Sequence, residues 1–243
     1  MLYSCLNENG LRPRTRMNRQ RTTYLTHRLS ALIVLVSTLW GTGLNTPIAR
    51  QDLVSLLPHG VAQAAGNAGM DSGLTVVTAG GDHTCAINDS ALYCWGRNQY
   101  SQLGDGTTSN RTAPVQVQNM SDGVTAVDAG HHHTCAIKNG ALYCWGQNNN
   151  GQLGNGTTSN SAVPTAVQNM DSGVTTVSAG GGHTCAIKSG ALYCWGRNNR
   201  GQLGNGTTNS SRTPVLVQNM NSGVTAVSAG NEHTCAIKSG ALY

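Results

Sequence analysis

Apolar and polar positions alternate in short runs from residue 71 to the end of the chain, and stretches rich in Gly and Asn separate the runs. Alternation with β-branched side chains favours strands, and Gly- and Asn-rich stretches favour turns. Each unit of the pattern predicts three strands and, after a Pro, a fourth. In residues 121–170 the expected strands are 124–130, 133–138, 141–145 and 164–168.

This pattern repeats every 50 residues, without gaps. The residues that mark the period include Cys85, Cys135, Cys185 and Cys235, and the series His83, His133, His183, His233 and Trp95, Trp145, Trp195. Self-similarity at a fixed period is the mark of a repeat architecture. We therefore divide the chain into an N-terminal segment, 1–64, and a repeat region, 65–243, whose copies are 71–120, 121–170, 171–220 and a partial copy, 221–243.

A two-residue turn at Asn139-Gly140 sets the register of the central hairpin in copy two. Asn-Gly between two apolar runs is a strong signal for a tight hairpin turn, because both turn residues take positive φ. Counting outward places Cys135 opposite Cys144 at a non-hydrogen-bonded position, where Cα atoms lie about 4.5 Å apart. That separation suits a disulfide. The spacing predicts three disulfides: Cys85–Cys94, Cys135–Cys144 and Cys185–Cys194.

A metal site is the alternative interpretation of these cysteines. His133 lies two residues before Cys135 and on the same face of its strand, so these two residues and Cys144 could supply three zinc ligands. We prefer disulfides, because directly opposed cysteines oxidise first in an exported chain. We expect no metal site, and we expect His133 to pack or form a hydrogen bond at the start of its strand.

The N-terminal segment has the features of an export signal. Residues 12–28 are basic, without an acidic residue, and the apolar run 29–40 follows them. A charged region before a short apolar run is typical of a secretory signal peptide, and this run is short for a membrane span. We expect a secreted or cell-surface protein, and no stable membrane insertion unless this segment remains as an anchor. Repeated disulfides, which form in oxidising compartments, point to the same location.

Composition and charge exclude several classes of protein. Only 10% of residues are charged, aromatic residues make up 5%, and Gly is abundant, with 31 residues. This profile suits short strands and turns rather than helical bundles. The net charge of +5 arises before residue 65, and the repeat region from residue 65 has eight basic and eight acidic residues. We therefore expect no nucleic-acid partner.

The motifs of each copy resemble those of the regulator of chromosome condensation repeat family. In copy two the matching elements are His-Thr-Cys-Ala-Ile (133–137), Leu-Tyr-Cys-Trp-Gly (142–146) and Gly-Gln-Leu-Gly-Asn-Gly (151–156). The resemblance covers residues 74–243, and the cysteine pair is similar to secreted bacterial members. It implies an all-β fold of β-propeller blades, each about 50 residues long and four-stranded, in a ring of seven.

The sequence contains about three and a half of these seven blades, so we expect a fragment of a longer reading frame. The partner that the repeat assigns to Cys235 would be residue 244, and we therefore expect Cys235 to lack a disulfide. An incomplete propeller leaves strand edges open to pairing with other chains.

Candidate binding residues come from comparing the copies with one another. Framework positions barely change, whereas residues before each His and after each Trp-Gly vary. Variable loops on a rigid scaffold are common binding sites. We expect these loops to line one face that binds a protein or a glycan; the residues concerned are Asp82, Arg97, Tyr100, His131, His132, Asn149, Arg197, Arg200, Asn231 and Glu232.

The repeat region offers no recurring catalytic constellation and no cofactor motif. The Gly104-Asp-Gly106 turn does not open a helix, as a dinucleotide-binding loop would. We therefore expect a non-catalytic extracellular interaction module that needs no cofactor. Two alternatives remain: guanine-nucleotide exchange on a small GTPase, which the family resemblance implies, and the non-catalytic part of a larger secreted enzyme.

Overall fold

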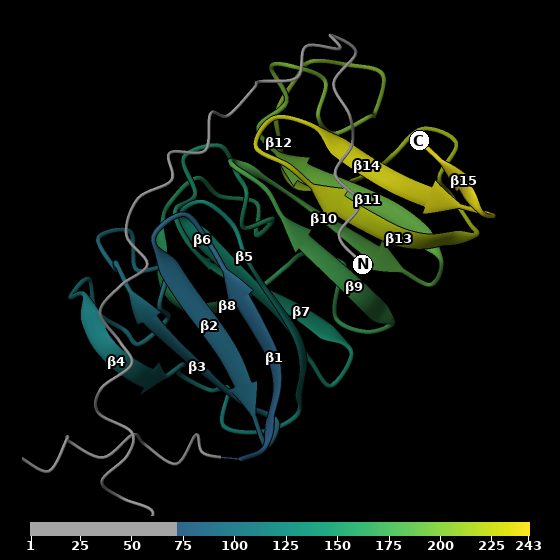
Figure 1. Cartoon of the computed structure of the whole chain (residues 1–243). Helices are drawn as coiled ribbons and strands as arrows, with labels where there is room; N and C mark the ends of the chain where they lie inside the picture. Colours follow the sequence, from purple (N-terminus) through teal and green to yellow (C-terminus); the bar gives the residue numbers. More distant parts are fainter. Residues whose placement is uncertain (1–71) are drawn as a thin grey trace, which may run out of the picture. The chain divides into compact units, whose positions relative to one another are not determined.

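A computed structural model describes residues 72–243, which belong to one compact unit, Ala64–Tyr243. The N-terminal segment, with the expected export signal and any cleavage site, lies outside the described residues. Among those residues no helix is long and apolar enough to cross a membrane. The described part consists of strands and turns, and its strands form four antiparallel sheets (Figure 1).

Three of these sheets are complete four-stranded blades. Strands follow one another within each sheet in sequence order, so every connection is a hairpin or a loop to the neighbouring strand. The blades are β1 (Leu74–Ala79), β2 (His83–Asn88), β3 (Ala91–Gly96) and β4 (Arg111–Gln116); β5 (Val124–Ala129), β6 (His133–Lys138), β7 (Ala141–Gly146) and β8 (Ser161–Ala166); and β9 (Val174–Ala179), β10 (His183–Lys188), β11 (Ala191–Gly196) and β12 (Ser211–Leu216).

The fourth sheet has three strands: β13 (Val224–Ala229), β14 (Thr234–Lys238) and the short β15 (Ala241–Leu242). The inner strands β1, β5, β9 and β13 contact one another in series, and each second strand contacts the inner strand of the next sheet. We call each contact between neighbouring blades a seam, numbered from the first to the third along the chain. The fold is an incomplete β-propeller of about three and a half blades, as the repeat predicted.

The central hairpins have the expected register. Asn139 and Gly140 both take positive φ, 51° and 78°, and Cys135 pairs with Cys144 across the two strands. The structure has the three disulfides of the repeat, Cys85–Cys94, Cys135–Cys144 and Cys185–Cys194, each with its Cα atoms 4.1 Å apart. Because Cys135 and Cys144 are bonded to each other, neither offers a thiolate for the alternative zinc site.

Two expectations need correction. The fourth strand of copy two begins at Ser161, before Pro164, because an edge strand tolerates a residue without an N–H donor. Cys235 is disulfide-bonded, contrary to the expectation that it lacks a partner. The expectation failed because it considered only partners across the same hairpin.

Buried side chains from two successive copies form each core cluster. The first cluster joins Leu92, Leu103, Val117 and Met120 of the first blade to Trp145 of the second. The second repeats this arrangement with Leu142, Leu153, Val167, Met170 and Trp195. Burial of the indole between blades therefore links the second blade to the first and the third blade to the second.

Candidate functional site: the loop face

The variable loops of each blade lie side by side at one end of that blade. In the first blade the N–H of Arg97, after β3, donates to the carbonyl of Asp82, before β2, at 2.9 Å. The same backbone bond joins Gln147 to His132 at 2.9 Å and Arg197 to Gly182 at 2.8 Å. The two sets of variable residues are thus adjacent in every complete blade.

Backbone bonds also join these loops from blade to blade. The N–H groups of Gly81, His131 and Gly181 donate to the carbonyls of Gly130, Gly180 and Gly230, each at 3.2 Å. The candidate residues therefore line a continuous surface across three seams, which we call the loop face. Its scaffold is hydrogen-bonded backbone, so the side chains project from fixed positions.

At the first seam a polar and aromatic cluster spans two blades. Arg97 forms an ion pair with Asp82 at 3.0 Å, and its guanidinium lies 5.9 Å from the centre of the Tyr100 ring. The Tyr100 ring lies 4.7 Å from that of His132, which in turn lies 4.1 Å from that of His131. Burial, followed by the charges of His131 and Arg97, lowers the pKa of His132, so this imidazole is neutral at pH 7.

At the third seam a second charged cluster spans two blades. Arg197 pairs with Glu232 at 3.2 Å, and the Arg200 Nε atom lies 3.9 Å from the same carboxylate. Asn231 packs against Gly181 of the preceding blade. The chain thus brings together Arg197, Arg200, Asn231 and Glu232, which come from two different copies.

The second seam lies between these clusters and carries small, uncharged groups. Asn149 is exposed, and the Asn150 side chain reaches toward Gly182 of the next blade. A Cβ atom added at Gly182 would lie 3.3 Å from Asn150 Nδ2 and 3.6 Å from Arg197. The loop face therefore has two charged ends and an amide-rich centre.

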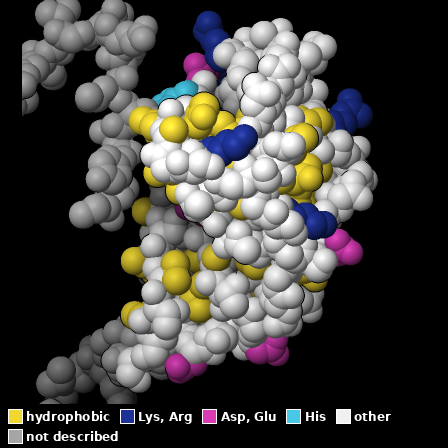
Figure 2. Space-filling model, turned by 90° about the vertical axis from the view of Figure 1, so that its right-hand side faces the viewer, with side chains coloured by type: hydrophobic (Ala, Val, Ile, Leu, Met, Phe, Trp, Pro, Cys, Tyr) yellow, Lys and Arg dark blue, Asp and Glu magenta, His cyan; other side chains and the backbone are white. Residues whose placement is uncertain are grey.

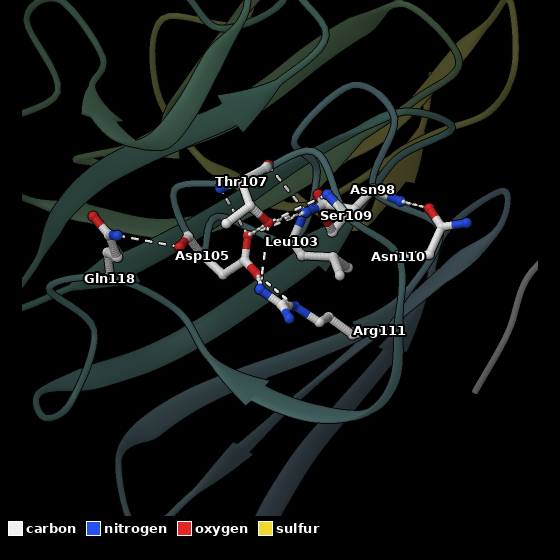
Figure 3. Close-up of polar contacts among 8 residues, drawn as sticks. All are labelled: Asn98, Leu103, Asp105, Thr107, Ser109, Asn110, Arg111 and Gln118. Carbon is white, nitrogen blue, oxygen red and sulfur yellow. Dashed lines mark hydrogen bonds and ion pairs between the residues drawn. The ribbon is translucent and has the colours of Figure 1, made fainter.

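A network of amide hydrogen bonds holds the long loop behind this face (Figure 3). In the first blade the buried Asn98 accepts the N–H of Leu103 at 2.9 Å and donates to Asp105 and to the Thr107 carbonyl, each at 3.1 Å. Arg111 forms an ion pair with Asp105 at 2.7 Å. Hydrogen bonds from Thr107 and Arg111 lower the pKa of Asp105, outweighing its desolvation.

Equivalent residues show which part of this network is framework. Asn148 and Asn198 repeat the contacts of Asn98, accepting from Leu153 and Leu203 at 2.9 Å. Asn155 and Asn205 replace Asp105, so the charged pair belongs to the first blade alone among the three complete blades. The loop conformation thus depends on the amide contacts rather than on the ion pair.

A polar ladder behind the loop face crosses all three seams. His83, His133 and His183 are buried, and their Nε2 atoms lie 2.8, 2.9 and 3.0 Å from the hydroxyls of Thr134, Thr184 and Thr234. Those hydroxyls donate to the carbonyls of Gln102, Gln152 and Gln202. Because each hydroxyl has one hydrogen, each Nε2 must carry a proton and donate.

These histidines are neutral for a clear physical reason. Burial lowers the pKa of His83 and His183 to about 4 and that of His133 to about 3. The Nδ1 atoms are buried, with no hydrogen-bond partner among the described residues, so a second proton would have no acceptor. Their role is therefore structural, which agrees with the expectation of a hydrogen-bonded His at the strand start.

Sequence reasoning did not identify the threonines or the Gln carbonyls of this ladder. The sequence did carry one signal for the threonines, which is the invariance of His-Thr in all four copies. It did not show which residues bond to each other, because each His bonds to the Thr of the next copy. Within residues 72–243, no three His, Cys, Asp or Glu side chains are grouped as metal ligands.

Repeated four-stranded blades, disulfides and a loop face across seams define a β-propeller repeat protein. Family models described as the regulator of chromosome condensation repeat match residues 89–137, 139–187 and 189–237, and a second model of the same repeat matches 75–102, 124–152 and 174–202. The chain belongs to the regulator of chromosome condensation repeat family.

Solved structures with this fold include Prp20p of Saccharomyces cerevisiae, at 22% identity and a TM-score of 0.59, whose report describes binding to Gsp1p and histones. Human WBSCR16 matches at 25% identity and the same TM-score. Each match covers 68% of this chain and 44% of the other chain. The chain thus spans less than half the length of these relatives.

Proposed function

We propose that this protein is an extracellular, non-catalytic interaction module that binds a protein or a glycan through the loop face. The observation that carries the proposal is the convergence of the variable residues. Positions that differ among otherwise near-identical copies meet across seams, as Arg97, Tyr100 and His132 do at the first. Arg and Tyr are enriched in the residues that dominate protein interfaces.

The chemistry of the face favours a polar, extended partner. Half-buried Arg97 and Tyr100 offer a cation and an aromatic ring, and the exposed Asn149 offers an amide between the charged ends. Aromatic rings with neighbouring amide and guanidinium donors suit acidic peptide segments as well as sugar hydroxyls. Three disulfides and the signal-like sequence of residues 12–40 support an oxidising, extracytoplasmic location.

A matched pair of variants tests this function. The loop-face variant is Arg97→Ala, Tyr100→Ala, Arg197→Ala and Arg200→Ala; the control, Lys138→Ala and Lys188→Ala, changes charges on the hairpins outside the loop face. Each protein is applied to a glycan array and used to capture proteins from the extracellular fraction of its source. We expect the control to retain the wild-type ligands and the loop-face variant to lose them.

The outcome is informative only for folded proteins, so the melting temperature and the three disulfides are measured first. Retention of every wild-type ligand by a folded loop-face variant would overturn the proposal. Equal loss in both variants would instead indicate that binding depends on net charge rather than on this face.

Guanine-nucleotide exchange on a small GTPase is the second candidate, because membership of the regulator of chromosome condensation repeat family implies it. It is tested by adding the protein to a small GTPase loaded with a fluorescent GDP analogue. We expect the rate of GDP release to remain at its intrinsic value. An acceleration that the loop-face variant abolishes would replace the interaction module with an exchange factor.

A further inference from the structure

Two adjacent imidazoles distinguish the first seam from the other two. Copy two has His131-His132 before its ladder histidine, whereas the equivalent positions are Gly81-Asp82, Gly181-Gly182 and Asn231-Glu232. The ring centres of His131 and His132 lie 4.1 Å apart, and His131 is exposed on the loop face. We call these two residues the histidine pair. Imidazoles are the side chains that change charge between about pH 5 and 8, so the charge of this seam depends on pH.

The charged groups that face the histidine pair come from two loops of the first copy. Asp82, before β2, and Arg97, after β3, form an ion pair with each other at 3.0 Å. The Tyr100 ring contacts both sides of the cluster, with its centre 4.7 Å from that of His132 and 5.9 Å from the Arg97 guanidinium. The Asp82 carboxylate acts on His132 as well, but Arg97 already binds it.

The other neighbours of the histidine pair supply no counter-charge. Two ladder histidines face it, and burial is the main cause of the lowered pKa of His83 and of His133, to which the charge of the pair adds. The third copy contributes the loop Gly180-Gly181-Gly182, whose first carbonyl accepts the N–H of His131 at 3.2 Å. The third copy therefore adds backbone rather than charge at this place.

Full protonation of the histidine pair is unfavourable unless an anion accompanies it. Burial, followed by the charges of His131 and Arg97, lowers the pKa of His132, because like charges so close together repel. An anion beside the two rings would remove this repulsion and favour the charged imidazoles. The bound state would then hold more protons than the free state, so affinity for the anion rises as the pH falls.

The surroundings of Tyr100 favour an acidic peptide over a sugar as the source of this anion. Arg97 and His132 both lie against the Tyr100 ring, so little of the aromatic face is left on which a sugar could stack. The His131 ring packs on the first copy, where a Cβ atom added at Gly81 would lie 2.7 Å from its Cδ2 atom. Basic and acidic side chains are scattered over the side of the molecule in Figure 2, so an acidic segment needs a local cluster of cations.

We propose that the first seam binds a carboxylate of an acidic peptide segment, and binds it more tightly as the histidine pair takes up protons below pH 7. The carboxylate accepts N–H groups of His131 and His132, and Arg97 adds a permanent positive charge beside Tyr100. At pH 7.5 the charges of Arg97 and Asp82 cancel, and protonation of the histidine pair then leaves a positive surplus. This inference rests on the proposed function, because it assigns a ligand chemistry and a pH response to part of the loop face.

A labelled acidic peptide tests the proposal. The probe is Gly-Asp-Asp-Asp-Gly, whose carboxylates remain largely ionised at pH 5.5, and a tetramethylrhodamine label reports its binding to the full chain by anisotropy. The matched peptide, Gly-Asn-Asn-Asn-Gly, has the same shape without the charges. We expect the affinity for the acidic peptide to rise at least fivefold from pH 7.5 to 5.5, since one added charge pair about 4 Å apart in water corresponds to about fivefold.

Two protein variants assign the pH response to the histidine pair. His131→Asn with His132→Asn removes both titrating rings and keeps polar side chains, so the affinity for the acidic peptide should no longer rise at pH 5.5. The matched control is His233→Asn, which removes an exposed histidine from the C-terminal sheet and should keep the full response. The melting temperature of every protein is measured at both pH values, because the buried ladder histidines also respond to acid.

Three results with folded proteins would overturn the proposal. They are no saturable binding at pH 5.5, equal binding of the two peptides, and an undiminished pH response in the variant that lacks the histidine pair. Binding of a labelled hyaluronan hexasaccharide in place of the peptide would assign the seam to an acidic glycan and overturn the peptide as its ligand. Failure of the proposed function gives a different result, because the loop-face variant would then keep its ligands at pH 7.5 whatever the peptide does.

Discussion

His133 Nε2 lies 2.9 Å from Thr184 Oγ1, and these two residues belong to different blades. The pair recurs between His83 and Thr134 and between His183 and Thr234, always 51 residues apart. A hydrogen bond from a buried, neutral imidazole, whose Nδ1 has no partner among the described residues, thus joins every pair of neighbouring blades. The stability of the whole repeat array therefore depends on the protonation of three buried histidines.

The first prediction concerns pH. The pKa of each ladder histidine is lowered in the folded state, to about 3 for His133, so the unfolded chain binds more protons below about pH 6.5. Stability is then full above pH 6.5 and falls as the pH drops from 6.5 toward 4. One pKa unit corresponds to about 1.4 kcal/mol, so three such groups should remove several kcal/mol.

Urea denaturation at pH 7.5, 6.0 and 4.5 measures this loss. His131→Ala is the control, because His131 is exposed and lies outside the ladder. It should change the pH dependence only slightly, because burial is the main cause of the lowered pKa of His133, while His133→Gln, which does not titrate, should reduce it clearly. Equal stability of the wild-type protein at pH 7.5 and 4.5 would contradict the prediction.

The second prediction concerns the disulfides. Cys135→Ala with Cys144→Ala removes a bond that spans nine positions in sequence and is buried in the second blade. Removing a disulfide that closes so short a loop should lower the free energy of unfolding by about 2–3 kcal/mol in the chain-entropy estimate. Chemical denaturation measures the change, and the difference from wild type should shrink when both proteins are reduced. If the variant remained less stable than the wild-type protein when both are reduced, the loss would come from altered packing rather than from the disulfide.

The third prediction compares two tryptophans. Trp145→Phe removes the donor to Gln102 and shrinks a fully buried side chain, so we expect a loss of about 1–3 kcal/mol in stability. Trp95 is only partly buried, and Trp95→Phe should cost less than half as much. Thermal unfolding of both variants provides the comparison. Equal losses would show that the seam contact of Trp145 adds little.

The fourth prediction concerns Asp128 on the inner strand of the second blade. Its carboxylate accepts the Thr78 hydroxyl at 3.0 Å and the Ala179 N–H at 2.8 Å, while burial raises its pKa. The equivalent Ser178 accepts the Ala229 N–H at 3.0 Å without a charge. Asp128→Ser should therefore increase stability at pH 7 by about 1 kcal/mol, because it removes a partly desolvated charge.

Denaturation at pH 7 and pH 4 tests this explanation. The gain from Asp128→Ser should be larger at pH 7, where the unfolded carboxyl is fully ionised, and smaller at pH 4. Thr78→Val is the control: it removes the hydroxyl donor to the carboxylate and should lower stability. A loss of stability in Asp128→Ser at pH 7 would show that the carboxylate hydrogen bonds outweigh its desolvation.

Local features of the fold could be predicted from the sequence because they depend on residues close in the chain. The Asn139-Gly140 turn sets the register that brings Cys135 and Cys144 together. The position of the fourth strand could not be predicted, since Pro164 was treated as its start although edge pairing begins at Ser161. Weak alternation in these edge strands carries little information about where pairing begins.

The seams could not be predicted because they depend on how one blade packs on the next. Trp145 donates to a carbonyl 43 residues earlier, and Thr134 donates to the same Gln102 carbonyl, 32 residues earlier. Backbone carbonyls carry no sequence signal. Invariance among the copies marked Trp and His-Thr as framework, but only the arrangement of the blades identified their partners.

The contacts at each seam have a consequence for how such a chain changes over generations. The same pairs join the first blade to the second and the second to the third, so no blade is matched to one particular neighbour. Duplication or deletion of a whole 50-residue unit by unequal recombination would preserve every remaining seam. The number of blades can therefore vary without new contacts being selected, while the loops of each copy diverge independently.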